Sequence, residues 1–167
     1  MSEKKQVVYD VDGFDVVTTA LTDLLNQYPK LAEGETIAFS YLGEDSGISY
    51  YPVSGAIVES DREGITGHVT QMCLYPFYVI IRAAKPKESR KVTIKEWLDD
   101  LGKWLEKQTL IIDDEEYSIA DYPPLTRNRE IKTIARQTPA HLDSVSDNGV
   151  EDWAIYITLK YKNEFER

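Results

Sequence analysis

The stretch Trp153-Ala-Ile-Tyr-Ile-Thr-Leu-Lys-Tyr161 decides the fold of this 167-residue chain. Successive side chains of a strand point to opposite faces of a sheet, so its regular alternation predicts a half-buried β-strand. A strand near a chain end stays ordered only against a partner, either within the fold or in a neighbouring subunit. The inward set is Trp153, Ile155, Ile157, Leu159 and Tyr161, and the outward set is Ala154, Tyr156, Thr158 and Lys160.

A second long strand is predicted over residues 67–83, and the second half of this segment is apolar on both faces. That pattern is typical of a strand covered on both sides, or of a strand in a subunit contact. Pro76 has no backbone N–H, so we expect a bulge or an edge register there. Cys73 is the single cysteine, which excludes an internal disulfide, and its apolar surroundings predict a buried, inert thiol.

Shorter strands are expected on both sides of this long strand. Runs of β-forming residues separated by turn-forming residues predict an antiparallel meander before it and further strands after the central helix. Polar residues predict a turn at 61–64 and a loop at 143–148. The expected short strands cover residues 36–42, 48–51, 55–60, 110–112 and 130–138.

Two helices are predicted from apolar residues at helical spacing. The first covers residues 14–28, with Asp12 as its cap and Pro29 as its stop. The second begins with Thr93 and Glu96 at capping-box spacing, after a surface connection at 84–91. Its apolar stripe, expected to pack on a sheet, consists of Ile94, Trp97, Leu98, Leu101, Trp104 and Leu105. Gly102 interrupts this helix and allows a close approach of another part of the chain.

This order of elements predicts an α+β fold with a mainly antiparallel β-sheet, and with the N-terminal helix and the central amphipathic helix packed on one face. The length suits a single domain over residues 1–167, and residues 1–10 are expected to form a flexible tail. No apolar run is long enough to suggest a signal peptide or a membrane span, so a soluble intracellular protein is expected.

The charge of the chain is strongly acidic, with a formal net charge of −10. Such a surface repels polyanions and disfavours nucleic-acid binding by charge. Opposite charges are concentrated in two segments, which can pair within one subunit or between copies of the chain. The candidate subunit-interface residues are Asp113, Asp114, Glu115, Glu116, Arg127, Arg129, Lys132, Arg136, Tyr156 and Lys160.

No catalytic motif is evident in the sequence. Asp61, Glu63 and His68 would supply the ligands if the chain were a small metal-dependent hydrolase or nuclease. However, no spacing matches a zinc site, a calcium loop, a phosphate-binding loop or a serine-nucleophile elbow. The sequence therefore predicts a protein that is not an enzyme and has no cofactor or metal.

The layout resembles that of the tail terminator and minor capsid proteins of long-tailed bacteriophages. The resemblance extends over nearly the whole chain and depends on the order of its elements and on their residue patterns. The segments that show it are residues 16–25, 37–41, 71–81, 94–105 and 153–161.

This resemblance implies a structural protein of a phage or prophage virion, assembled in the bacterial cytoplasm. Proteins of this family form a ring, commonly a hexamer, that ends tail-tube polymerisation and joins the tail to the head. The implied partners are other copies of the chain, the tail-tube protein and head-connector proteins, with no membrane. DNA would pass through the acidic lumen without specific binding. A head-completion or connector protein of the same virion is the alternative that the sequence leaves open.

Overall fold

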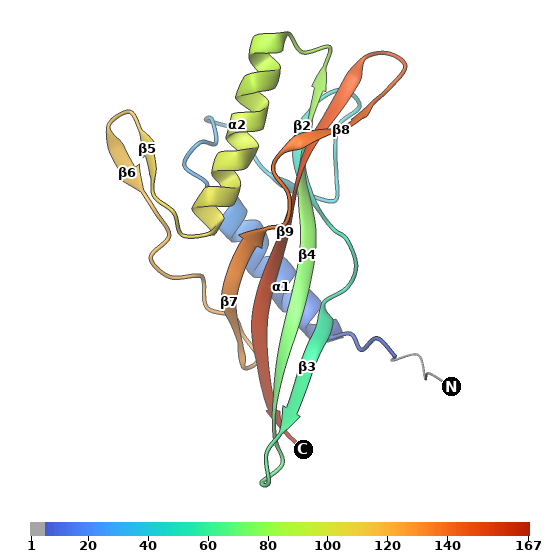
Figure 1. Cartoon of the computed structure of the whole chain (residues 1–167), viewed down its shortest axis with the longest axis vertical. Coiled ribbons are helices and arrows are strands. Elements are labelled where there is room, and N and C mark those ends of the chain that lie inside the picture. Colours follow the sequence, from blue (N-terminus) through green and yellow to red (C-terminus); the bar gives the residue numbers. More distant parts are fainter. Residues whose placement is uncertain (1–5) are drawn as a thin grey trace.

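A computed structural model describes residues 6–167, which form a seven-stranded sheet, two helices and a separate two-stranded hairpin (Figure 1). The sheet is mainly antiparallel, so the expected α+β class is confirmed. The helices are α1 (Val11–Leu25) and α2 (Glu88–Leu105). The strands are β1 (Ala38–Phe39), β2 (Gly47–Pro52), β3 (Ile57–Glu63), β4 (His68–Ala84), β5 (Leu110–Ile112), β6 (Glu115–Tyr117), β7 (Arg129–Arg136), β8 (His141–Val145) and β9 (Val150–Glu166).

The centre of the sheet is the antiparallel pair β4 and β9, each 17 residues long. They pair without interruption from His68 opposite Glu166 to Ala84 opposite Val150. On β9, the inward residues Ile155, Ile157, Leu159 and Tyr161 are fully buried, as the alternation predicted. The strand extends beyond the predicted segment at both ends because β4 offers a partner along its whole length.

Both outer edges of this central pair are divided between two short strands. On the β4 side, β2 pairs with residues 77–82 and β3 pairs with residues 69–74. Pro76 lies between these two pairings, where its carbonyl accepts a hydrogen bond of 2.9 Å from the Val53 amide. Its nitrogen therefore faces the gap, and no ladder hydrogen bond is lost. The expected edge register is confirmed, and Pro76 remains paired with Thr158 on the β9 side without a bulge.

Several predictions for the shorter strands were wrong. The strand expected at residues 36–42 is reduced to β1, which pairs with β2 in parallel. It ends before Ser40, whose φ of 50° lies outside the β region. In the loop that follows, the Gly43 carbonyl accepts a hydrogen bond of 3.0 Å from Arg82. β3 extends to Glu63 and so takes up most of the turn expected at 61–64, and β8 occupies part of the loop expected at 143–148. In both places a neighbouring long strand supplies pairing that outweighs weak local propensity.

β7 departs from strict alternation. A bulge between Ile131 and Thr133 adds one residue, so Ile131 and Ile134 both face the core although they are three positions apart.

The start of α1 differs from the prediction. The cap is Asp10, not Asp12: its carboxylate accepts a hydrogen bond of 3.1 Å from the Gly13 amide. The preceding residues pair with the outer edge of β3, where the Val8 carbonyl accepts from the Val58 amide at 2.9 Å. The flexible tail expected over residues 1–10 is therefore wrong for residues 8–10, and residues 1–5 lie outside the described part of the chain.

α2 begins five residues before the predicted capping box. Thr93 lies inside the helix and donates its hydroxyl to the Ser89 carbonyl at 3.0 Å, so it is not a cap. Part of the expected surface connection at 84–91 is thus the first turn of α2. Neither helix of the described residues is long and apolar enough to cross a membrane.

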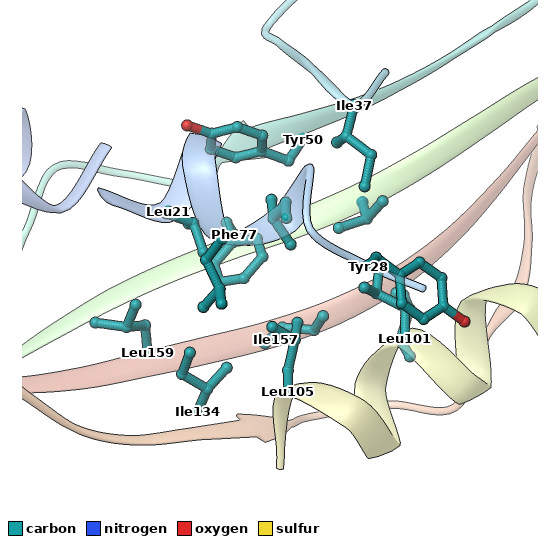
Figure 2. Close-up of a cluster of buried hydrophobic side chains, with 14 of the residues drawn as sticks. Leu21, Tyr28, Ile37, Tyr50, Phe77, Leu101, Leu105, Ile134, Ile157 and Leu159 are labelled. Atoms are coloured by element: carbon teal, nitrogen blue, oxygen red, sulfur yellow. The ribbon is translucent and has the colours of Figure 1, made fainter. Parts of the chain in front are cut away.

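Both helices bury their apolar stripes against the same face of the sheet. Figure 2 shows Leu21 of α1 and Leu101 of α2 in one cluster with Phe77 of β4 and Ile157 of β9. Cys73 belongs to this core, as expected, and burial raises the pKa of its thiol to about 11. Most of the predicted stripe of α2 is buried, and Trp97 packs edge-on against Tyr28 with the ring centroids 4.8 Å apart.

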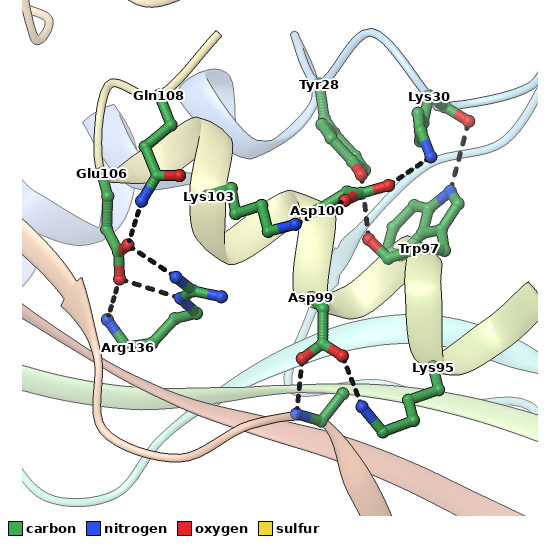
Figure 3. A network of polar contacts seen from close by, with 11 residues as sticks. Tyr28, Lys30, Lys95, Trp97, Asp99, Asp100, Lys103, Glu106, Gln108 and Arg136 are labelled. Atoms are coloured by element: carbon green, nitrogen blue, oxygen red, sulfur yellow. Dashed lines mark hydrogen bonds and ion pairs between the residues drawn. The ribbon is translucent and has the colours of Figure 1, made fainter. Parts of the chain in front are cut away.

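Ion pairs and hydrogen bonds also hold α2 in place (Figure 3). The Arg136 guanidinium donates to both oxygens of Glu106 at 2.9 and 3.0 Å, and its backbone amide donates to the same carboxylate at 2.8 Å. Asp99 accepts from the Ala140 amide at 2.8 Å. These contacts join α2 to β7 and to the loop that leads into β8.

Gly102→Ala is expected to destabilise the protein by about 1–3 kcal/mol, although alanine favours a helix over glycine by about 1 kcal/mol. A Cβ at position 102 would overlap Cδ of Arg136 and lie 2.5 Å from its Cγ. The Arg136 side chain would have to leave its pair with Glu106. Urea denaturation measures the change in unfolding free energy.

The control is the same substitution in an Arg136→Ala background, where the obstructing side chain is gone. There, Gly102→Ala should be neutral or stabilising. An equal loss in both backgrounds would show that the contact with Arg136 is not the cause.

Candidate functional site

The helices cover one face of the sheet, and no other element of residues 6–167 covers the opposite face. On β4, this uncovered face presents an apolar series at every second position. The strand is thus apolar on both faces, as the sequence predicted, but the chain covers only one of them. The series is Met72, Leu74, Pro76, Tyr78 and Ile80.

A row of aromatic rings crosses the uncovered face and joins four strands. Tyr51 of β2 stacks on Tyr78 of β4, with the ring centroids 5.5 Å apart. Tyr78 lies 5.4 Å from Tyr156 of β9, which stacks in turn on His141 of β8 at 5.9 Å. Strand pairing aligns this row, because Tyr78 is directly opposite both Tyr51 and Tyr156.

Tyr78 at the centre of the aromatic row carries no charge near neutral pH. Burial, followed by the neighbouring Tyr156, Tyr51 and Asp143, raises the pKa of Tyr78, so its phenol remains protonated. Beside the row lie Ile80 and Ala154, which are only 7% and 0% exposed because other atoms of the chain itself cover them, although no helix or strand of residues 6–167 lies over this face. The centre of the face therefore resembles one layer of a sheet-on-sheet interface.

Charged residues at the margins of the face form pairs. Arg82 donates to both oxygens of Asp152 at 2.8 and 2.9 Å. Nearer the other end, Lys160 lies 2.9 Å from Glu59, and Lys162 lies 2.7 Å from Glu164. Each of these three positive charges has its own negative partner in a chain of net charge −10.

Of the predicted interface residues, Tyr156 and Lys160 lie on this face. Tyr51, Tyr78 and His141 also lie there and were not predicted as interface residues. The doubly apolar β4 indicated that Tyr78 faces outward, but no sequence pattern places residues of four separate strands in one row. The row depends on strand register, which pairs residues far apart in sequence.

The two charged segments do not pair with each other within the described chain. The acidic residues Asp113, Asp114, Glu115 and Glu116 lie exposed on the β5–β6 hairpin. The basic residues have other partners: Arg127 lies 3.7 Å from Asp12, Arg129 binds Asp10, Lys132 lies 3.2 Å from Glu130, and Arg136 binds Glu106. Pairing of the two segments within one subunit is therefore wrong, because nearer acids already bind the basic residues.

The residues considered as metal ligands have separate surroundings. Asp61 and Glu63 lie 3.8 and 3.1 Å from the Arg167 guanidinium, whereas His68 contacts Glu166 at 2.7 Å and Glu164 at 3.6 Å. Among residues 6–167, no group of three or more His, Cys, Asp or Glu side chains is placed to hold a metal ion. The three residues are thus not brought together as one site.

Comparison with models of known protein families finds no match to this chain. A comparison with curated proteins likewise finds none. The inference of function therefore depends on the uncovered sheet face and on the resemblance to phage tail-completion proteins.

Proposed function

We propose that this chain is a non-enzymatic structural protein of a bacteriophage virion, a tail terminator or minor capsid subunit. In this proposal, copies assemble into a ring, hexameric as in the family it resembles, that ends tail-tube polymerisation and joins the tail to the head. The observation that supports it best is the second apolar face of β4, which has no cover within the described chain. A subunit contact is one of the two explanations that the sequence allowed for such a strand.

The dimensions of the uncovered face suit a stable contact. A strand of 17 residues is roughly 55 Å long at about 3.3 Å per residue. Four neighbouring strands at about 4.8 Å spacing make a face roughly 15–19 Å wide. The resulting area of roughly 800–1,000 Å² matches the roughly 800 Å² that each partner buries in a typical stable interface.

The charge distribution supports the same proposal. Acidic molecules repel one another when they assemble, unless they meet through surfaces whose charges are balanced. The Tyr78 phenol at the centre of the aromatic row is protonated, and the ion pairs around the row are matched. Elsewhere the acidic surface would repel DNA phosphates, which suits a ring through which DNA slides.

The test is assembly of the purified chain with the tail-tube protein of a long-tailed phage, observed by mass photometry and negative-stain electron microscopy. We expect closed rings at one end of each tube and shorter tubes as the chain is added. Rings that bind head connectors but not tubes would support the head-completion alternative. A chain that stays monomeric at high concentration beside tubes would overturn the proposal.

A further inference from the structure

A groove lies on the helical side of the molecule, between α1 and residues 116–127. It consists of two adjoining hollows of about 750 and 430 Å³ that share Gln27 and Pro123 in their walls. α1 forms one wall, and the irregular chain after β6 forms the other. The groove is separate from the uncovered sheet face, since none of the residues that line it belongs to β4 or β9.

Carboxylates line both walls of the groove. Asp15 and Asp23 come from α1, and Glu116 and Asp121 come from the opposite wall. None of the four has an ion-pair partner among residues 6–167. Arg127 also lines the groove and lies 3.7 Å from Asp12, so the four carboxylates leave the lining net acidic. A net acidic lining favours a cationic occupant and repels nucleic acid.

The remaining lining of the groove is apolar and suits a polypeptide. Leu24, Trp104 and Ile119 form buried parts of the surface, and Pro29 and Pro123 add rigid apolar edges. Aromatic side chains and proline residues of this kind bind extended peptide segments with little loss of side-chain entropy.

Part of the second wall also offers free backbone groups. Residues 118–122, 125 and 126 form no backbone–backbone hydrogen bond with the described chain. Pro123 and Pro124 have no N–H to donate, and the Arg127 carbonyl accepts a hydrogen bond of 2.9 Å from the Arg129 guanidinium. An extended chain laid beside the free groups can therefore gain main-chain hydrogen bonds, as in the addition of a strand to a sheet edge. This feature favours a polypeptide over a small cation such as a polyamine.

We propose that this groove binds an extended, positively charged segment of another polypeptide. α1 has 15 residues and is roughly 22 Å long at about 1.5 Å per residue. An extended segment of about six or seven residues has the same length. Its lysine or arginine side chains would pair with the carboxylates of both walls, while its backbone lies against residues 118–127. The proposal is independent of ring assembly.

The experiment measures binding of a fluorescein-labelled peptide, Lys-Pro-Arg-Val-Lys-Pro-Arg, to the full chain by fluorescence anisotropy at low salt. A peptide with glutamine in place of each basic residue is the ligand control. A photo-reactive version of the basic peptide locates its contacts by mass spectrometry. We expect saturable binding of the basic peptide and cross-links to α1 and to residues 116–127.

Two triple variants with the same change in net charge separate groove binding from general attraction to an acidic protein. Asp23→Asn, Glu116→Gln and Asp121→Asn together should weaken binding at least tenfold. The control triple replaces Asp45, Asp113 and Asp114 with asparagine. These residues lie outside the groove lining, so their replacement should weaken peptide binding less than threefold. Equal weakening by both triples, cross-links elsewhere, or no saturation would overturn the proposal, whether or not the chain forms rings.

Discussion

Replacing Asp10 with alanine is expected to lower the free energy of unfolding by about 3–5 kcal/mol. The Asp10 carboxylate accepts two hydrogen bonds from Arg129 at 2.6 and 2.9 Å, one from the Tyr161 hydroxyl at 2.8 Å, and one from the Gly13 amide at 3.1 Å. The side chains of Asp10 and Arg129 are each only 8% exposed. Without Asp10, a buried guanidinium loses its counter-charge and α1 loses its cap.

Asp12→Ala is the matched control, because it also removes an aspartate that pairs with an arginine. The Asp12 side chain is 72% exposed and lies 3.7 Å from Arg127, so its loss should change stability by less than about 1 kcal/mol. Urea denaturation of the three proteins measures both effects. Similar losses in the two variants would show that Asp10 does not form the buried connection described above.

The contribution of Asp10 should also depend on pH. Burial on its own raises the pKa of this carboxyl, but hydrogen bonds from Arg129, Tyr161 and Gly13 outweigh it and hold the pKa below the usual 3.8. A carboxyl whose pKa is lowered by folding stabilises the native state above its unfolded pKa. The stability difference between the native protein and Asp10→Ala should thus be constant from about pH 5 to 8 and shrink below about pH 4.

Tyr78→Asp is expected to raise the concentration needed for self-assembly at least tenfold, if the proposed ring forms through the uncovered sheet face. Tyr78 is the centre of the aromatic row, with Tyr51 on one side and Tyr156 on the other. An aspartate there would place an unpaired charge inside the contact, which costs several kcal/mol. The isolated chain should still fold, because the Tyr78 side chain is only half-buried.

Val92→Asp is the control for this experiment, since it adds the same charge at a 58% exposed position of α2, away from the sheet face. Tyr78→Phe should assemble at a concentration within about twofold of that of the native protein, because phenylalanine keeps the aromatic ring of the side chain. Mass photometry with and without tail tubes measures assembly, and thermal unfolding checks the fold. Normal assembly of Tyr78→Asp would show that the sheet face is not the contact between subunits. This result would not contradict a ring that forms through other surfaces.

Much of the fold could be predicted because it is encoded in local periodicity. The alternation around Ile155 and Ile157 determined both the strand type of β9 and its inward face. The helical spacing of Leu98, Leu101 and Leu105 likewise determined which side of α2 is buried. Such patterns depend only on the geometry of one element, so they are readable without knowing its neighbours.

Helix boundaries were predicted less well. Asp12 and Thr93 both have the residue type of a cap, yet Asp10 caps α1 and α2 begins before Thr93. Asp10 is selected by contacts with Arg129 and Tyr161, which lie more than a hundred positions away. A cap residue type is common in the sequence, and only long-range contacts decide which one is used.

The sequence by itself determined the α+β class, the two long strands, the buried stripes and the second apolar face of β4. Only the tertiary structure decided that this face stays uncovered, that Tyr51, Tyr78, Tyr156 and His141 form one row, and that Arg129 and Arg136 bind acids outside the β5–β6 hairpin. The physical reason is that periodicity reports which way a side chain points, whereas its neighbours across a sheet are set by strand order and register.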